Sequence, residues 1–158
     1  MANLDNARQN ACAALDRLGI PYACHEHSAA ATCAEPARLV HGLPGTPGKC
    51  LLLKTNRAEY FLVIAPCANR LDLQRLAVEL GCGRLSFATT DELETLLQSA
   101  PGSVSPFGLM HDTSRKIQVV IDARLAADHH CQFHPNDNRA TLVLKTSGKQ
   151  ILAKSQCW

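Results

Sequence analysis

The sequence predicts an α/β fold in which helices surround a mixed, strongly curved and partly barrel-like sheet. Two apolar runs of strand length, 49–54 and 59–65, are joined by a link short enough for a hairpin. Segments with helical spacing carry their own start and stop signals, most clearly at 73–80. Strands and helices interleave without a strict βαβ rhythm, which favours a mixed sheet over a parallel one.

Length and composition predict one domain spanning residues 1–158. The chain is 46% hydrophobic and 19% charged, with a net charge of +2, so it has enough apolar mass for a core. No apolar run approaches the ~20 residues that a membrane span needs. The N-terminus has no basic segment followed by an apolar one, as a signal peptide would have. We therefore expect a cytoplasmic protein that does not contact membranes.

The first third of the chain predicts two helices and a strand. Residues 3–18 place apolar side chains on one helical face, and Gly19 ends the helix. Residues 21–27 alternate weakly, like a short strand. Thr32 and Glu35 match a capping box for a helix over 33–40. The Gly- and Pro-rich stretch 42–48 is expected to be a loop.

The remainder predicts further short strands and two more capped helices. Asp72 and Gly81 bracket the helix 73–80, and Thr89 to Glu92 form a second capping box before another helix. The stretch 100–106 is too rich in Pro and Gly for regular structure. Further strands are expected at 85–88, 107–110, 117–121, 131–134 and 140–144, and a last helix from Thr146.

The eight cysteines are interpreted mainly as small apolar core residues. None forms a Cys-x-x-Cys pair, so neither a zinc ribbon nor a thioredoxin-like motif is present. Disulfides are not expected in a protein that is not secreted. Cys50 is the exception of interest, because it adjoins Lys49.

Lys49 is the first candidate site residue. A lysine beside apolar strands is often a surface side chain whose stem covers apolar neighbours. Here it follows a Gly/Pro loop, and such loops bring backbone N–H groups close to ligands. The ammonium group could hold a phosphate or a carbonyl oxygen. The second candidate is the stiff loop 101–106, which is either an ordinary connection or a pocket wall.

His134 is the third candidate, because it lies at a strand end in Phe-His-Pro. A structural role is the alternative for a lone histidine. His25 and His27 share a strand face but lack an obvious third ligand, so no metal site is expected. Cys50 and His134 could be drawn as a thiol and its base. The sequence contains neither Gly-x-Ser-x-Gly nor a phosphate-binding Gly-x-x-x-x-Gly-Lys motif.

The basic residues near these elements are either scattered surface charges or a ring around one cleft. A ring would suit the end of an RNA, where phosphates carry most of the affinity. The residues are Lys49, Lys54, Arg57, Arg70, Arg75, Arg84, Arg115, Lys116 and Arg139.

Taken together, these stretches resemble the YbaK/ProX family of aminoacyl-tRNA deacylases, free-standing relatives of the editing domain of bacterial prolyl-tRNA synthetases. The resemblance spans about 25–145. Within the family, the sequence is most similar to the branch that acts on alanyl-tRNA(Pro). The matching stretches are Leu43-Pro44-Gly45 with Lys49-x-Leu51-x-Leu53-Lys54, Asp72-Leu73 to Leu80-Gly81, Gly83-Arg84-Leu85-Ser86-Phe87, Pro101 to Leu109 with Asp112, and Phe133-His134-Pro135 with Asn138 and Ala140-Thr141.

The resemblance implies a YbaK-like fold and a role for each candidate. Lys49 would hold the terminal adenosine end of the tRNA, and His134 would lie near the pocket. Gly102, Ser103, Val104, Ser105 and Pro106 would line the aminoacyl pocket and limit its size. No protein nucleophile is established in the family: the 2′-hydroxyl of the terminal ribose and a positioned water are thought to share the work. Lys54 and Arg84 are candidates for phosphate contacts.

One departure concerns Cys50, which stands where that branch usually has asparagine. The thiol is smaller and a weaker donor than an amide, so the identity of the amino acid removed is an open question. The implied partners are aminoacyl-tRNA, in particular tRNA(Pro), and a transient contact with prolyl-tRNA synthetase, with no DNA. No cofactor is implied. The alternative function is a non-catalytic regulator that binds tRNA ends or nucleotides.

Overall fold

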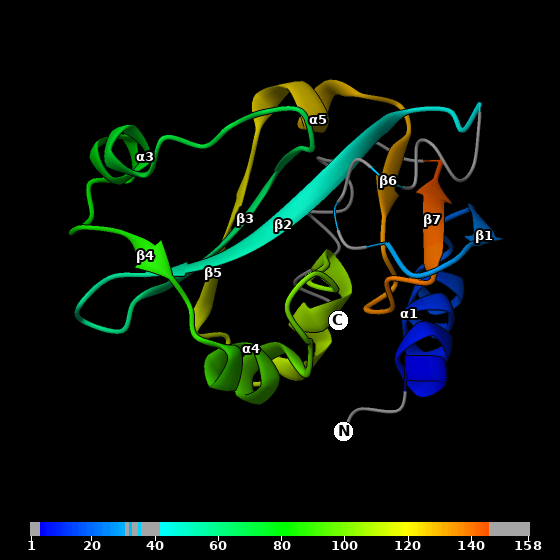
Figure 1. The fold of residues 1–158 in the computed structure, drawn as a ribbon, viewed down its shortest axis with the longest axis horizontal. Helices are drawn as coiled ribbons and strands as arrows, with labels where there is room; N and C mark the ends of the chain where they lie inside the picture. Colours follow the sequence, from blue (N-terminus) through cyan, green and yellow to red (C-terminus); the bar gives the residue numbers. More distant parts are fainter. Residues whose placement is uncertain (1–3, 31, 33–34, 36–41, 146–158) are drawn as a thin grey trace.

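The computed structural model describes residues 4–30, 32, 35 and 42–145 of the chain (Figure 1). The expected helices at 33–40 and from Thr146 onward lie outside these residues. The described elements, in chain order, are α1 Leu4–Leu18, β1 Tyr22–Glu26, β2 Thr46–Lys54, β3 Tyr60–Pro66, α3 Leu73–Leu80, β4 Ser86–Phe87, α4 Thr90–Leu97, the 3-10 helix η1 Pro106–His111, β5 Ile117–Ile121, α5 Ala123–Ala127, β6 Cys131–Phe133 and β7 Ala140–Leu144.

The sheet is mixed, as the sequence predicts, and it is open. Its strand order is β1-β7-β6-β2-β3-β5, and β4 pairs with the end of β2. The pairs β2–β6 and β3–β5 are parallel, whereas the others are antiparallel. Strand β2 is long: its first residues pair with β6 and its later residues pair with β3 and β4. In Figure 1, α4 lies below β2, and α1 lies near β1 and β7. Because no strand joins β1 to β5 among the described residues, the sheet is not closed into a barrel.

Strand β2 begins earlier than the sequence suggested. Residues 42–48 were expected to form a loop, but Thr46 and Pro47 pair in parallel with Cys131 and Gln132 of β6. Proline lacks an N–H group, yet the carbonyl of Pro47 still accepts a hydrogen bond from Cys67 N at 2.8 Å. Strand pairing with a segment remote in sequence therefore overrides the local turn signal.

The segment 107–110 was expected to be a strand and is instead part of η1. Ser105 caps this 3-10 helix by accepting a hydrogen bond from Phe107 N, and Pro106 occupies the first turn, where its missing N–H is not needed. Phe107 is fully buried. Helix α5 was also not predicted from the sequence; Asp122 caps it by accepting a hydrogen bond from Arg124 N at 2.9 Å.

The elements with strong local signals form where they were predicted. Asp72 caps α3 through two backbone N–H groups, and Gly81 ends it in the left-handed conformation at φ 63°. Thr89 and Glu92 make the predicted reciprocal capping box of α4. Strands β2 and β3 form the expected hairpin, in which the Thr55 hydroxyl organises the turn.

The two faces of β2 bury different clusters. Cys50 and Leu52 belong to the main core, whereas Leu53 packs on the opposite face in a smaller cluster below α3. Cys50 and Cys131 are buried, as expected of core cysteines, but Cys24 is exposed. Cys67 is disulfide-bonded, so the expectation that disulfides are absent is wrong there. The prediction rested on the expectation that the protein is not secreted, which does not report which cysteines the fold brings within bonding distance. None of the described helices is long and apolar enough to cross a bilayer.

Candidate active site

A cavity of about 310 Å³ opens on one side of β2 and brings several of the predicted site residues together. Its floor is residues 48–52 of β2, which include Lys49 and Cys50. One side consists of Phe87 of β4, the next residue, Ala88, and Leu93 of α4. The other sides consist of Pro101, Gly102, Val104 and His134. Parts of the chain from residue 48 to residue 134 therefore surround one small space.

Lys49 lies in β2 opposite Ala65 of β3 and is half-buried. Its ammonium group donates hydrogen bonds to the carbonyl oxygens of Cys67 and Asn69, in the segment that follows β3. Those carbonyls restrict the side chain and compensate part of the cost of burying its charge. Because an ammonium group has three donors, these contacts leave a third N–H for a ligand.

The predicted wall segment 102–106 divides into residues that face the cavity and residues that hold them. Gly102, at φ 84°, and Val104 line the cavity. Ser103, Ser105 and Pro106 are buried and are not lining residues. The Ser105 hydroxyl donates to Asn136 Oδ1 at 2.6 Å, which ties this wall to the turn between β6 and β7. The wall is thus anchored to the same turn that follows His134.

His134 directly follows β6, and its ring orientation is set by one main-chain hydrogen bond. Its Nδ1 lies 2.8 Å from the carbonyl oxygen of Ala140. A carbonyl can only accept, so Nδ1 carries the proton and Nε2 of the neutral ring is an acceptor. Burial lowers the pKa of His134 below its ordinary value, which favours this neutral form. The ring of His27 lies 5.9 Å away, between centroids.

Cys50 lines the same cavity and is only 6% exposed. Burial raises the pKa of its thiol well above the ordinary range, so the sulfur stays protonated. A protonated thiol is a poor nucleophile, and its burial therefore favours a lining role over a thiol–histidine pair.

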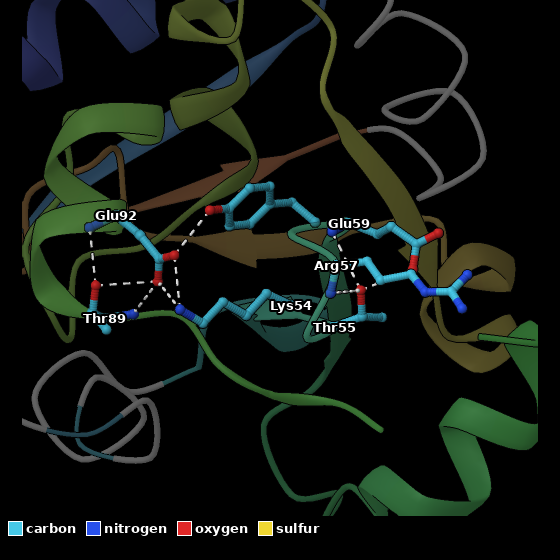
Figure 2. Close-up of polar contacts among 7 residues, drawn as sticks. Lys54, Thr55, Arg57, Glu59, Thr89 and Glu92 are labelled. Atoms are coloured by element: carbon cyan, nitrogen blue, oxygen red, sulfur yellow. Dashed lines mark hydrogen bonds and ion pairs between the residues drawn. The ribbon is translucent and has the colours of Figure 1, made fainter. Parts of the chain in front are cut away.

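Lys54 and Arg84 lie outside this cavity and line a second cleft of about 540 Å³. The ammonium group of Lys54 is 2.8 Å from both carboxylate oxygens of Glu92. Glu92 also accepts hydrogen bonds from the hydroxyl of Tyr60 and from the backbone N–H of Thr89. Figure 2 shows Lys54 and Thr89 converging on this carboxylate. The hydrogen bond from Lys54, followed by that from Thr89, lowers the pKa of Glu92 to about 2.

Several residues of the site were not anticipated as such. The sequence predicted a strand at 85–88 and placed Leu93 on a helical face, but nothing in it indicated that Phe87 and Leu93 line the Lys49 cavity. The capping box did identify Glu92, though not its contacts with Lys54 and Tyr60. Within the part of the chain that the structure describes, no three His, Cys, Asp or Glu side chains gather to hold a metal ion.

Comparison with known proteins gives concordant results. The family model for the aminoacyl-tRNA editing domain matches residues 27–151. Prolyl-tRNA editing protein ProX of Acetoanaerobium sticklandii is 32% identical over 151 residues, covering 95% of this chain and 92% of that protein. Prolyl-tRNA synthetase associated domain-containing protein 1 of Danio rerio is 34% identical over 130 residues, covering 81% and 71%. A solved structure of a candidate trans-editing enzyme for prolyl tRNA synthetase superposes with a TM-score of 0.75 at 25% identity, covering 95% and 92%.

Proposed function

The chain belongs to the aminoacyl-tRNA editing domain family, and we propose that it removes a small, wrongly attached amino acid, in particular alanine, from tRNA(Pro). In this proposal residues 1–158 act as one editing domain that meets prolyl-tRNA synthetase transiently. The observation that carries it is the cavity in which Lys49, His134 and the Gly102–Val104 wall meet. The name of the relative ProX, a prolyl-tRNA editing protein, supports tRNA(Pro) as the partner.

The size of the cavity supports a small aminoacyl group. About 310 Å³ is at the lower end of the ~300–1,000 Å³ usual for ligand pockets. Val104 and the buried residues behind it limit the space available to a longer side chain. Ser105 is held by Asn136, so the wall cannot yield without breaking a buried hydrogen bond. Exclusion by size needs no polar contact with the amino acid, which suits discrimination against a larger side chain.

The proposed reaction is hydrolysis of the ester between the amino acid and the terminal ribose. Water adds to the carbonyl carbon, the ribose oxygen leaves, and the products are the free amino acid and the free tRNA end. Nε2 of neutral His134 accepts a hydrogen bond from the attacking water or from a ribose hydroxyl. Lys49 holds the tRNA end through its remaining N–H donor. Positioning and stabilisation of the developing oxyanion would supply most of the acceleration.

Deacylation of alanyl-tRNA(Pro) tests this function. We expect the wild type to release alanine and Lys49→Ala to lower kcat/KM roughly 10- to 150-fold, the loss of one hydrogen bond to a charged group. Lys116→Ala, which removes an exposed lysine outside the cavity, is the matched control and should behave like the wild type. Side-by-side assays with other mischarged tRNAs identify the amino acid that is removed.

The same assay separates the two alternatives. Tight binding of alanyl-tRNA(Pro) by the wild type without release of alanine would contradict the enzyme and support a non-catalytic module that binds tRNA ends. Cys50→Ser should retain most of the activity, because the buried thiol is protonated. Loss of all activity in that variant, with its fold intact, would instead support a thiol enzyme.

A further inference from the structure

We propose that Phe87 is a stacking platform for the terminal base of tRNA, and that the adjoining cleft at Arg84 takes the phosphates that precede it. This inference rests on the proposed function, because it extends the ester-binding cavity toward the RNA that carries the ester. It assigns an interaction surface and a recognition role to strand β4.

Phe87 is exposed where the other phenylalanines are not. Its side chain is 58% exposed, whereas Phe61, Phe107 and Phe133 are 4%, 0% and 2% exposed. Phe87 is also one of the residues that line the cavity of Lys49 and His134. Leaving a large aromatic surface in water forgoes the free energy of burial, and a ligand that covers the ring would regain it.

The ring is presented from a fixed backbone. Strand β4 pairs with the end of β2, where Phe87 lies opposite Leu53, and Ala88 N donates to Leu52 O at 2.9 Å. The partner Leu53 is fully buried. Because β4 is held by the sheet, the platform does not have to be ordered when the ligand binds.

Strand β4 also connects the two cavities. Phe87 lines the cavity that contains Lys49, and the preceding residue, Ser86, lines the second cleft together with Arg84 and Asn56. The two cavities are therefore lined by neighbouring residues of β4, so a ligand that extends from the first cavity past Phe87 would reach the second cleft. The aminoacylated end of a tRNA matches this arrangement, because the aminoacyl ester is followed by the terminal base and then by a phosphate.

The chemistry of the second cleft suits a phosphate more than an apolar partner. Arg84 is exposed at this cleft, and its planar guanidinium group matches phosphate oxygens. Lys54 lies there too, but its charge is balanced by Glu92, so Arg84 is the remaining cation among the described residues that line this cleft. An aromatic ring beside a cation is the combination that binds single-stranded nucleic acid.

A double-mutant cycle with RNA tests the contact between ring and base. Wild type and Phe87→Ala would be titrated with the trinucleotide CCA and with the same trinucleotide lacking its terminal base. Stacking of one base predicts that Phe87→Ala weakens binding of CCA about 5- to 100-fold. The same substitution should leave binding of the abasic probe within about 2-fold, because the stacking partner is already missing.

Two further variants sharpen the test. Phe87→Trp keeps an aromatic face and should bind CCA at least as well as the wild type. Val78→Ala removes the other large exposed apolar side chain of the described residues, which is 81% exposed on α3, and should change nothing. Arg84→Ala should weaken both probes equally and reduce the dependence of binding on salt.

The outcomes separate this inference from the proposed function. If Phe87→Ala weakens CCA and the abasic probe equally, or weakens neither, the stacking platform is overturned even when the wild type deacylates alanyl-tRNA(Pro). If the ring and base are coupled but no aminoacyl-tRNA is hydrolysed, the platform stands and the enzyme does not. Wild-type protein that does not bind CCA at all also overturns the platform.

Discussion

Substituting Glu92 tests how α4 is attached to the sheet. Its carboxylate accepts hydrogen bonds from Lys54 of β2, Tyr60 of β3 and Thr89 at the start of α4. The next residue, Leu93, lines the cavity. Glu92 therefore ties the helix that carries one side of the cavity to the hairpin that carries its floor. Glu92→Gln keeps the shape of the side chain but removes its charge and one acceptor oxygen.

The expected loss follows from the number of contacts. Hydrogen bonds to charged groups contribute about 1.5–3 kcal/mol each, and neutral ones about 1 kcal/mol. Glutamine retains one acceptor and places an NH₂ group among donors from Lys54 and Thr89. Because the side chain can rotate to keep its best contacts, we expect a net decrease of about 2 kcal/mol in the free energy of unfolding. For a chain of this size, that corresponds to a decrease in Tm of about 4–8 °C.

Urea unfolding of the two proteins as a function of pH measures the effect and its cause. The pKa of Glu92 is about 2 when folded, against 4.5 for an unperturbed glutamate. The folded state thus binds fewer protons between these values, so the stabilisation is fully present above pH 4.5 and is lost as pH falls toward 2. The difference between wild type and Glu92→Gln, which cannot titrate at this position, should shrink in that window.

Glu79→Gln is the matched control, because it removes an exposed carboxylate paired with Arg75 one helical turn away. That surface pair should contribute less than about 0.5 kcal/mol. A Glu92→Gln protein as stable as Glu79→Gln at pH 7 would refute the reasoning. A difference from wild type that stays constant from pH 6 to pH 3 would refute the electrostatic explanation.

Two other predictions concern the cavity. Deacylation by the wild type should continue below pH 6.5 and decline only when the lowered pKa of His134 is reached, because protonation removes the Nε2 acceptor. The measurement is the pH–rate profile of the wild type and of His134→Gln, in which the decline at acid pH should be missing. An identical decline in both proteins would contradict the assignment. Gly48→Ala should cost about 1–3 kcal/mol of stability, measured by thermal unfolding, because the new Cβ would overlap the ring of Phe133. Gly83→Ala, whose Cβ would lie 3.6 Å from Asn56, is the control, and equal losses would contradict the steric explanation.

The elements that could be predicted from the sequence are those whose signals are local. The α3 helix carries a cap at each end within ten residues, and the Thr89–Glu92 box starts α4. The failures occur where a remote partner decides the outcome. Residues 46–47 become strand because β6 pairs with them, and Phe107 becomes part of a 3-10 helix because Ser105 and Pro106 start one.

The candidate site shows the same division. Lys49, Gly102, Val104 and His134 were proposed from motifs, and the fold places them around one cavity. Ser105 was proposed as a lining residue but lies behind the wall, where it binds Asn136. Motifs report which residue types occur together, whereas the direction of each side chain depends on packing between segments that are distant in sequence.

The contact between β2 and β6 has a consequence for the order of folding. The amide of Gln132 donates to the carbonyl oxygens of Leu43, Pro44 and Gly45, which are 87 to 89 positions away. Closing so long a loop costs chain entropy before any contact compensates for it, so the local hairpins and helices should form first. His134 takes its place at the Lys49 cavity only once β6 has docked, so this cavity should be completed late in folding.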